Sequence, residues 1–187
     1  MPIKVNKDKV ILGIDPGTTV MGYGIIKITN NKMELLAMGA IELHKLETHY
    51  DKLQKIFERT NYLLDEYKPD EVALEAPFMG KNAQSMLKLG RAQGVSMAAA
   101  LSKNLSVFEY APKKIKQSIT GSGSASKEQV AGMLVSILKL KSVPKYLDAT
   151  DGLAVAVCHH FQGGRTTTDK SYSGWGAFVK ANPKRTK

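Results

Sequence analysis

The stretch from Val10 to Ile26, VILGIDPGTTVMGYGII, constrains the fold more than any other part of the chain. Its first apolar run ends in one carboxylate, Asp15, and Pro16-Gly17 follows directly. A second apolar run begins at Val20, so the stretch predicts a strand, a tight turn and a second strand. An ionised group at the end of a buried strand costs free energy unless another charge compensates it. Asp15 therefore either caps the turn, as Asp often does, or faces a metal ion or a basic ligand.

Strand and helix patterns alternate through the rest of the folded part. Three strands over 10–15, 20–29 and 33–43 are joined by short connections and predict an antiparallel meander. The later pattern predicts strands over 71–75 and 106–110, and helices over 49–67, 82–102, 112–119, 126–140 and 146–161. The first of these helices is amphipathic, with Leu53, Ile56, Phe57, Leu63 and Leu64 on its apolar face. The helix over 126–140 has an apolar face of Val130, Met133, Leu134, Ile137 and Leu138. This mixture predicts one α/β domain.

The helix predicted over 82–102 has an unusually broad face of small and apolar side chains. A helix that is apolar nearly all round is covered on both sides. One side would lie on the sheet, and the other would pack either on a second copy of the chain or within the monomer. Small residues favour the second copy because they allow a close approach. The face comprises Ala83, Met86, Leu87, Gly90, Gly94, Met97, Ala98 and Leu101.

The formal net charge of +10 is distributed unevenly. Between Ala76 and Lys145 only Glu109 and Glu128 are acidic, against eleven Lys or Arg, and residues 163–187 are again basic. Two basic segments favour binding of a polyanion by one face of the molecule. Net charge indicates non-specific attraction, so a surface of solvated lysines stays an alternative to nucleic acid binding.

The sequence also indicates the cellular compartment and the end of the folded domain. No apolar run reaches the ~18–20 residues needed to span a bilayer. The first ten residues carry charges without a long apolar region behind them, so we expect no signal peptide. The single cysteine, Cys158, cannot form an intrachain disulfide, so we expect a reducing, cytoplasmic environment. Gly163-Gly164 predicts a boundary between a folded domain, residues 1–162, and a basic tail, residues 163–187. We expect a mostly disordered tail, in which Trp175 and Phe178 could dock locally or stack on bases.

Four carboxylates stand where a sheet and a helix could bring them together. Asp15 and Glu75 each end a strand, and parallel neighbours would place both at the carboxyl edge of the sheet. Asp148 and Asp151 are three residues apart, so they share one face at the start of the last helix, where acids also simply complement the helix dipole. Four hard oxygen donors without a Cys or His cluster suit Mg²⁺ or Mn²⁺ better than zinc.

Such a cluster among lysines is suited to phosphodiester chemistry. Two metal ions about 3.5–4 Å apart could activate a water molecule and stabilise the leaving oxygen. The lysines would contact phosphates, and the metal ions would remove the repulsion between the acids and DNA. We interpret Cys158, His159 and His160 as core and helix C-terminal residues and not as catalytic groups.

Four motifs in this order and spacing resemble the RuvC family of bacterial Holliday-junction resolvases: IDPGTTVMGYGII, ALEAPFMGKNAQSMLKLGRAQG, FEYAPKKIKQSITGSGSASKEQV and DATDGLAVAVCHH. Each motif alone is weak, whereas the four in register over residues 10–161 are specific. The resemblance implies an RNase H-like fold, with a five-stranded mixed sheet in the order 3-2-1-4-5 and helices on both faces. It also implies a homodimer that presents two sites to a four-way junction, with the branch-migration proteins RuvA and RuvB as partners.

The resemblance assigns roles at the matching positions. It implies that four carboxylates bind metal and catalyse, with two Mg²⁺ per subunit and Mn²⁺ as a substitute: Asp15, Glu75, Asp148 and Asp151. Phe78 matches an aromatic residue that stacks on an unpaired base at the crossover, and Lys116 and Lys127 match basic residues near the scissile phosphate. Further candidate DNA contacts from the basic segment are Arg91, Lys113 and Lys114. Thr19 departs from the family pattern, because many members have a basic residue there.

The expected reaction is metal-dependent hydrolysis of two phosphodiesters, one on each of two strands of like polarity, leaving ligatable 5′-phosphate ends. Two other functions stay open. IDPGTT also resembles the phosphate-binding turn of sugar kinases and actin-like ATPases, but these need two such domains and a second Gly-rich loop. A basic dimer could instead bind branched DNA by shape without cleaving it, although uncompensated carboxylates weaken DNA binding.

Overall fold

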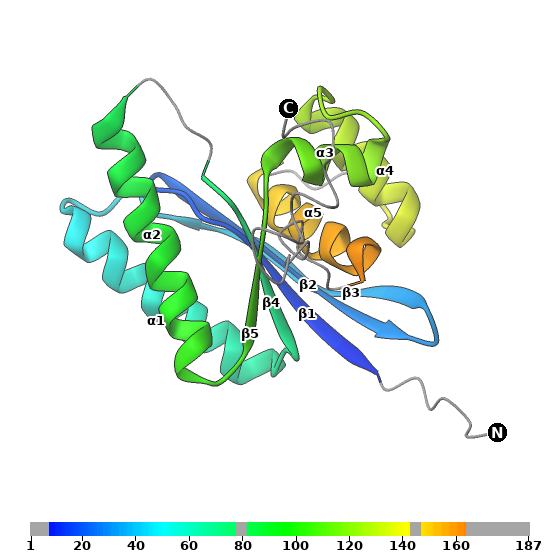
Figure 1. Ribbon diagram of the computed structural model, residues 1–187, viewed down its shortest axis with the longest axis horizontal. Helices are drawn as coiled ribbons and strands as arrows, with labels where there is room; N and C mark the ends of the chain where they lie inside the picture. Colours follow the sequence, from blue (N-terminus) through cyan, green and yellow to red (C-terminus); the bar gives the residue numbers. More distant parts are fainter. Residues whose placement is uncertain (1–7, 78–81, 143–146, 164–187) are drawn as a thin grey trace, which may run out of the picture.

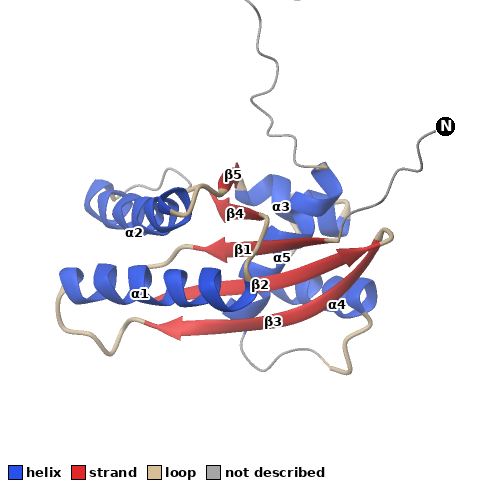
Figure 2. Ribbon diagram, turned by 90° about the horizontal axis from the view of Figure 1, so that it is seen from below, coloured by secondary structure: helices blue, strands red, loops and turns tan. Residues whose placement is uncertain are grey.

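The computed structural model describes residues 8–77, 82–142 and 147–163. One mixed sheet has the strand order β3-β2-β1-β4-β5, with β1–β2 and β2–β3 antiparallel and β1–β4 and β4–β5 parallel. Helices α1 and α2 cover one face, and α3, α4 and α5 cover the other (Figures 1 and 2). This confirms the predicted strand order and the helices on both faces. In chain order the elements are β1 (Lys9–Asp15), β2 (Val20–Thr29), β3 (Lys32–Glu42), α1 (His49–Tyr67), β4 (Glu71–Glu75), α2 (Ala83–Ser102), β5 (Ser106–Tyr110), α3 (Pro112–Thr120), α4 (Lys127–Leu138) and α5 (Leu147–Gln162).

Local capping signals set the helix ends. The hydroxyl of Thr48 accepts from the backbone N–H of Asp51, whose carboxylate accepts in return, so α1 begins with a capping box. Ser126 and Gln129 form the same motif at α4. Pro112 opens α3, where its missing N–H costs nothing.

Alternate residues of the central strands build two cores, because successive side chains of a strand point to opposite faces. Ile11 packs with Leu153 and other residues of α5, whereas Leu12 packs with Ile56 and Leu63 of α1. All five side chains are at most 1% exposed. The sheet is therefore covered on both faces around β1, the strand that ends at Asp15.

Glycines bring α5 unusually close to β1 and β2. A Cβ on Gly24 would lie 2.6 Å from the backbone nitrogen of Leu153, and one on Gly13 would lie 2.9 Å from Cα of Ala156. A Cβ on Gly152 would lie 2.5 Å from the backbone nitrogen of Tyr23. Backbone therefore packs on backbone, and the start of α5 is held beside the end of β1.

Two side chains differ from the predicted helix faces. Phe57 of α1 is 46% exposed and Met133 of α4 is 41% exposed, although the helical pattern placed both inside. In α1 the buried positions are Ile56, Thr60, Leu63 and Leu64, a narrower stripe than predicted. Phe57 follows Ile56 by about 100° around the helix, which turns it away from the sheet.

One face of α2 packs on the sheet and the opposite face is exposed. The buried residues are Ala92, Gln93, Ser96, Ala99 and Ala100. Leu87 and Leu101 on the other face are 60% and 59% exposed, and nothing within the described part of the chain lies within 4 Å of a Cβ built on Gly90 or Gly94. The alternative that the described monomer buries α2 on both sides is therefore wrong. The exposed stripe, named here the α2 outer face, comprises Ala83, Leu87, Gly90, Gly94, Ala98 and Leu101.

Two predictions fall outside the described residues, namely the stacking role of Phe78 and the disorder of the tail after Gly163. None of the described helices is both long and apolar enough to cross a membrane.

Candidate active site at the carboxyl ends of β1 and β4

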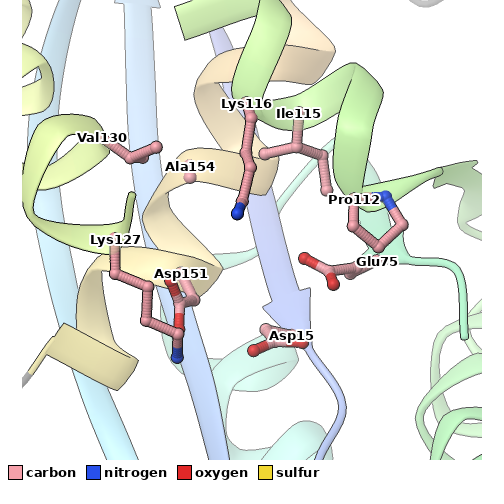
Figure 3. A pocket seen from close by; sticks show the side chains of 9 residues that line it. All are labelled: Asp15, Glu75, Pro112, Ile115, Lys116, Lys127, Val130, Asp151 and Ala154. Carbon is pink, nitrogen blue, oxygen red and sulfur yellow. The ribbon is translucent and has the colours of Figure 1, made fainter. Parts of the chain in front are cut away.

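A hollow of about 240 Å³ lies where β1 and β4 end, between the sheet and helices α3, α4 and α5 (Figure 3). Its polar lining consists of three carboxylates and two lysines that come from five different elements. The apolar part of its wall consists of Pro112, Ile115, Val130 and Ala154. The polar residues are Asp15, Glu75, Lys116, Lys127 and Asp151.

The strand register places two of the acids side by side. Ile14 pairs with Leu74 in the parallel β1–β4 ladder, so Asp15 and Glu75 are the next residues of adjacent strands. Both strands end there because Pro16 and Pro77 follow closely. The predicted position of the two carboxylates at the carboxyl edge of the sheet is therefore confirmed.

Helix α5 adds the other two acids, but in different positions. Asp151 lines the hollow, and its side chain is 14% exposed. Asp148 lies one turn earlier at the rim, with its side chain 48% exposed. The close contact between α5 and β2 sets this arrangement, since a Cβ on Gly22 would lie 3.1 Å from the carbonyl carbon of Asp148.

Lys127, the first residue of α4, reaches the acids of α5. Its Nζ lies 2.6 Å from Oδ2 of Asp151 and 3.5 Å from Oδ1 of Asp148. Lys116 enters the same hollow from α3 (Figure 3). The two lysines that were predicted beside a scissile phosphate therefore lie together with the acids.

Burial makes the acids hard to ionise. Burial, and then the charge of Asp151, raises the pKa of Asp15 to about 7. Burial, and then the charge of Asp15, raises the pKa of Glu75 to about 8. Lys127 opposes both shifts without cancelling them. Perturbed pKa values in a hollow are typical of functional sites, and this cluster would gain from further positive charge.

The donor set fits a hard divalent cation. Carboxylate oxygens are the ligands that Mg²⁺ and Mn²⁺ prefer, and neither a thiol nor an imidazole lines the hollow among the described residues. In the described part of the chain, no three acidic, His or Cys side chains lie close enough together to surround one ion.

The backbone around Glu75 has a support that the sequence did not reveal. Nε2 of the buried Gln93 in α2 donates to Oε1 of Glu109 at 2.6 Å and to the carbonyl oxygen of Glu75 at 3.4 Å. The N–H of Ala76 donates to the carbonyl of Tyr110 at 2.9 Å. The only sequence signal for this role is that Gln93 is a single amide among the small residues on the buried face of α2.

The remaining candidates lie outside the hollow. Lys113 of α3 is exposed and Lys114 is partly buried, and neither lines the cavity. Arg91 is exposed on α2, the helix on the opposite face of the sheet. His159 is fully buried, with Nδ1 2.7 Å from the hydroxyl of Tyr110 and Nε2 2.5 Å from Glu71. Its predicted place in the core is confirmed.

The raised pKa values of Asp15 and Glu75 predict that these two groups contribute less to stability in EDTA as the pH rises. Asp15 and Glu75 keep their protons up to about pH 7 and 8 when folded, but release them near pH 4 in the unfolded chain. These two groups bind more protons in the folded state between those values, so their contribution to the free energy of unfolding falls from about pH 4 to pH 8. Burial lowers the pKa of His159 and His160, which contributes in the opposite direction as the pH rises toward 6.5. Urea unfolding at pH 5 and 8.5 would measure this loss. Asp15→Asn should reduce the difference, and an unreduced difference would assign it to other groups.

Comparisons with known proteins identify the family of this chain. A family model described as crossover junction endodeoxyribonuclease RuvC matches residues 11–159. Curated relatives with this description include one from Christiangramia forsetii, 61% identical over 97% of this chain and 94% of the relative, and one from Bacteroides fragilis, 57% identical over 97% of each. Among solved structures, Thermus thermophilus RuvC matches with a TM-score of 0.74 and 32% identity, over 82% of this chain and 95% of that chain. The same protein in complex with a Holliday junction substrate matches with a TM-score of 0.74 and 30% identity, over 82% and 94%. The predicted RNase H-like fold is confirmed, and the chain belongs to the RuvC family of crossover junction endodeoxyribonucleases.

Proposed function

We propose that this protein resolves Holliday junctions by metal-dependent phosphodiester hydrolysis, with paired symmetric nicks in two strands of like polarity, during recombination and DNA repair. The observation that carries the proposal is the hollow in which Asp15, Glu75 and Asp151 face Lys116 and Lys127. Membership of the RuvC family supports it, and a Thermus thermophilus relative has been solved with a Holliday junction substrate.

The side chains divide the work by charge. Asp15, Glu75 and Asp151, with Asp148 at the rim, would hold Mg²⁺, two ions per subunit, and Mn²⁺ would substitute. Bound metal supplies an activated water and neutralises the leaving oxygen. The ammonium group of Lys116 holds and orients the scissile phosphate through charge-assisted hydrogen bonds. The apolar wall of the hollow limits water around the phosphate and strengthens these interactions.

We further propose that the protein acts as a homodimer through the α2 outer face. This face is exposed, apolar and free of bulky side chains at Gly90 and Gly94, so a second helix can approach closely. Exposed apolar surface of this kind marks protein interfaces. Two copies supply the two sites that paired nicks require. The proposed setting is the cytoplasm, with RuvA and RuvB as branch-migration partners.

Gly94→Arg should convert the dimer to a monomer. The long charged side chain would stand on the face through which the two helices approach, and burying it without a partner is costly. Sedimentation velocity would measure the change, and junction nicks should lose their pairing. Gly132→Arg is the matched control, because Gly132 is also a helical glycine with nothing described within 4 Å. An intact dimer in Gly94→Arg would place the interface elsewhere.

The proposed function is tested by cleavage of a synthetic four-way junction beside a linear duplex of the same sequence, each in Mg²⁺ and in EDTA. Paired nicks in the junction alone, only in Mg²⁺, are the expected result. Tight junction binding without cleavage would favour the binding-module alternative. Equal cleavage of both substrates would identify a nuclease without junction specificity.

A further inference from the structure

One lysine bridges two carboxylates of the proposed metal site. Nζ of Lys127 lies 2.6 Å from Asp151 and 3.5 Å from Asp148. Figure 3 shows the ammonium group beside the Asp151 carboxylate, on the side of the hollow that Asp15 also faces. Asp151 is the acid of α5 that lines the cavity, so Lys127 is bound to a carboxylate that the proposed function needs for metal.

We infer that Lys127 acts as a competing internal cation: its ammonium group neutralises the carboxylates of α5 until a divalent ion displaces it, and the displaced group then binds the substrate phosphate. The inference rests on the proposed function, because it takes Asp151 as a metal ligand. It concerns how the site is filled and in what order, which the proposed function leaves open.

Both cations cannot occupy the same place. A Mg²⁺ ion lies about 2.1 Å from each carboxylate oxygen that it binds. An ammonium group at hydrogen-bond distance from the same carboxylate would then lie within roughly 5 Å of a double positive charge. Because the cavity is partly enclosed, water screens that repulsion incompletely. The divalent ion therefore gains by expelling Lys127 from Asp151.

The geometry lets the lysine leave without a change of fold. The capping box of Ser126 and Gln129 fixes the backbone of Lys127 at the start of α4, while its side chain is 52% exposed. In the described part of the chain, its ion pairs are those with Asp148 and Asp151. Rotation of the side chain alone would carry the ammonium group from the acids into the open side of the hollow.

The displaced ammonium group would need an anion, and the substrate supplies one. Lys116 lines the same hollow, so a phosphate there would meet two lysines instead of one. Metal binding would free Lys127 for the phosphate, and the phosphate would draw Lys127 away from Asp151. Metal and phosphate then each raise the binding affinity of the other by the same factor, as linkage requires.

Lys116 provides a matched control. It lies in the same cavity and its charge also acts on Glu75 and Asp151, but it makes no ion pair with a described residue. Removing Lys116 lowers the positive potential of the hollow without vacating a carboxylate. Removing Lys127 does both, so the difference between the two variants isolates the competition for Asp151.

The first test is calorimetric titration of Mn²⁺ into the full-length protein without DNA. Lys127→Met should bind Mn²⁺ about fivefold more tightly than the unsubstituted protein, the upper end of what a half-exposed ion pair contributes. Lys116→Met should tighten binding by no more than about twofold, as expected for a screened charge without a contact. Circular dichroism of all three proteins would verify the fold.

The second test observes the lysine itself. In a Mg²⁺ titration followed by NMR of the lysine side-chain ammonium groups, the Lys127 signal, assigned with Lys127→Arg, should move and saturate with the metal. The inference would be overturned by equal Mn²⁺ affinities of Lys127→Met and the unsubstituted protein, by an equal gain in affinity in Lys116→Met, or by a Lys127 signal that does not move. Mg²⁺-dependent junction cleavage would uphold the proposed function in each of these cases. Absence of both metal binding and cleavage in the unsubstituted protein would overturn the proposed function itself.

Discussion

Asp15→Asn should reduce Mg²⁺-dependent cleavage of a four-way junction by at least about 1,000-fold, or ~4 kcal/mol at 1.36 kcal/mol per factor of ten. Asp15 lies between Glu75 and the acids of α5, so an amide there removes the charge that the metal-binding cluster shares. Junction binding should persist or tighten, because the substitution removes a negative charge that repels phosphates. Single-turnover cleavage and gel-shift titration with the same junction would measure the two effects.

The design separates loss of metal chemistry from loss of fold. Burial raises the pKa of Asp15, so a neutral Asn should keep or increase the stability of the protein in EDTA. Asp148→Asn is the control for a weaker effect. The Asp148 side chain lies at the rim, so this substitution should reduce the cleavage rate less than Asp15→Asn does. Unchanged cleavage in Asp15→Asn would remove Asp15 from the site, and lost junction binding would assign it to DNA contact instead.

The elements of this fold could be predicted because their signals are local. The capping residues at α4, the apolar runs of β1 and β2 and the turn at Pro16-Gly17 each act within a few residues. The strand order came from the family resemblance, since pairing of β1 with β4 joins segments about sixty residues apart. The exposed Phe57 was mispredicted because only tertiary packing determines how wide a stripe of α1 the sheet covers.

The sequence could predict the positions of those site residues that stand at the ends of strands. Asp15 and Glu75 follow from a parallel register and from the turns behind both strands. The difference between the inner Asp151 and the outer Asp148 depends on the rotation of α5 about its axis, which the spacing of two acids leaves open. The Lys127–Asp151 and Gln93–Glu75 contacts join separate elements, so no periodicity could reveal them.

Gly152→Ala should lower the free energy of unfolding by at least about 3 kcal/mol, near the upper end of what overpacking costs. The added Cβ would lie 2.5 Å from the backbone nitrogen of Tyr23 and 2.6 Å from the carbonyl carbon of Gly22. Backbone atoms of a central strand cannot rotate aside as a side chain can, so α5 itself must move. Urea unfolding at pH 7 would measure the loss.

Gly132→Ala, at a helical glycine of α4, should change the free energy of unfolding in the opposite direction. Nothing in the described structure lies within 4 Å of its added Cβ, so alanine should raise the free energy of unfolding by about 0.5–1 kcal/mol.

Because Asp151 adjoins Gly152, a helix that moves away from β2 also withdraws this carboxylate from Asp15 and Glu75. Folded Gly152→Ala protein should therefore need more Mg²⁺ for half-maximal cleavage than Gly132→Ala does. Equal stability and equal Mg²⁺ dependence in the two variants would show that the glycine contact does not fix the position of Asp151.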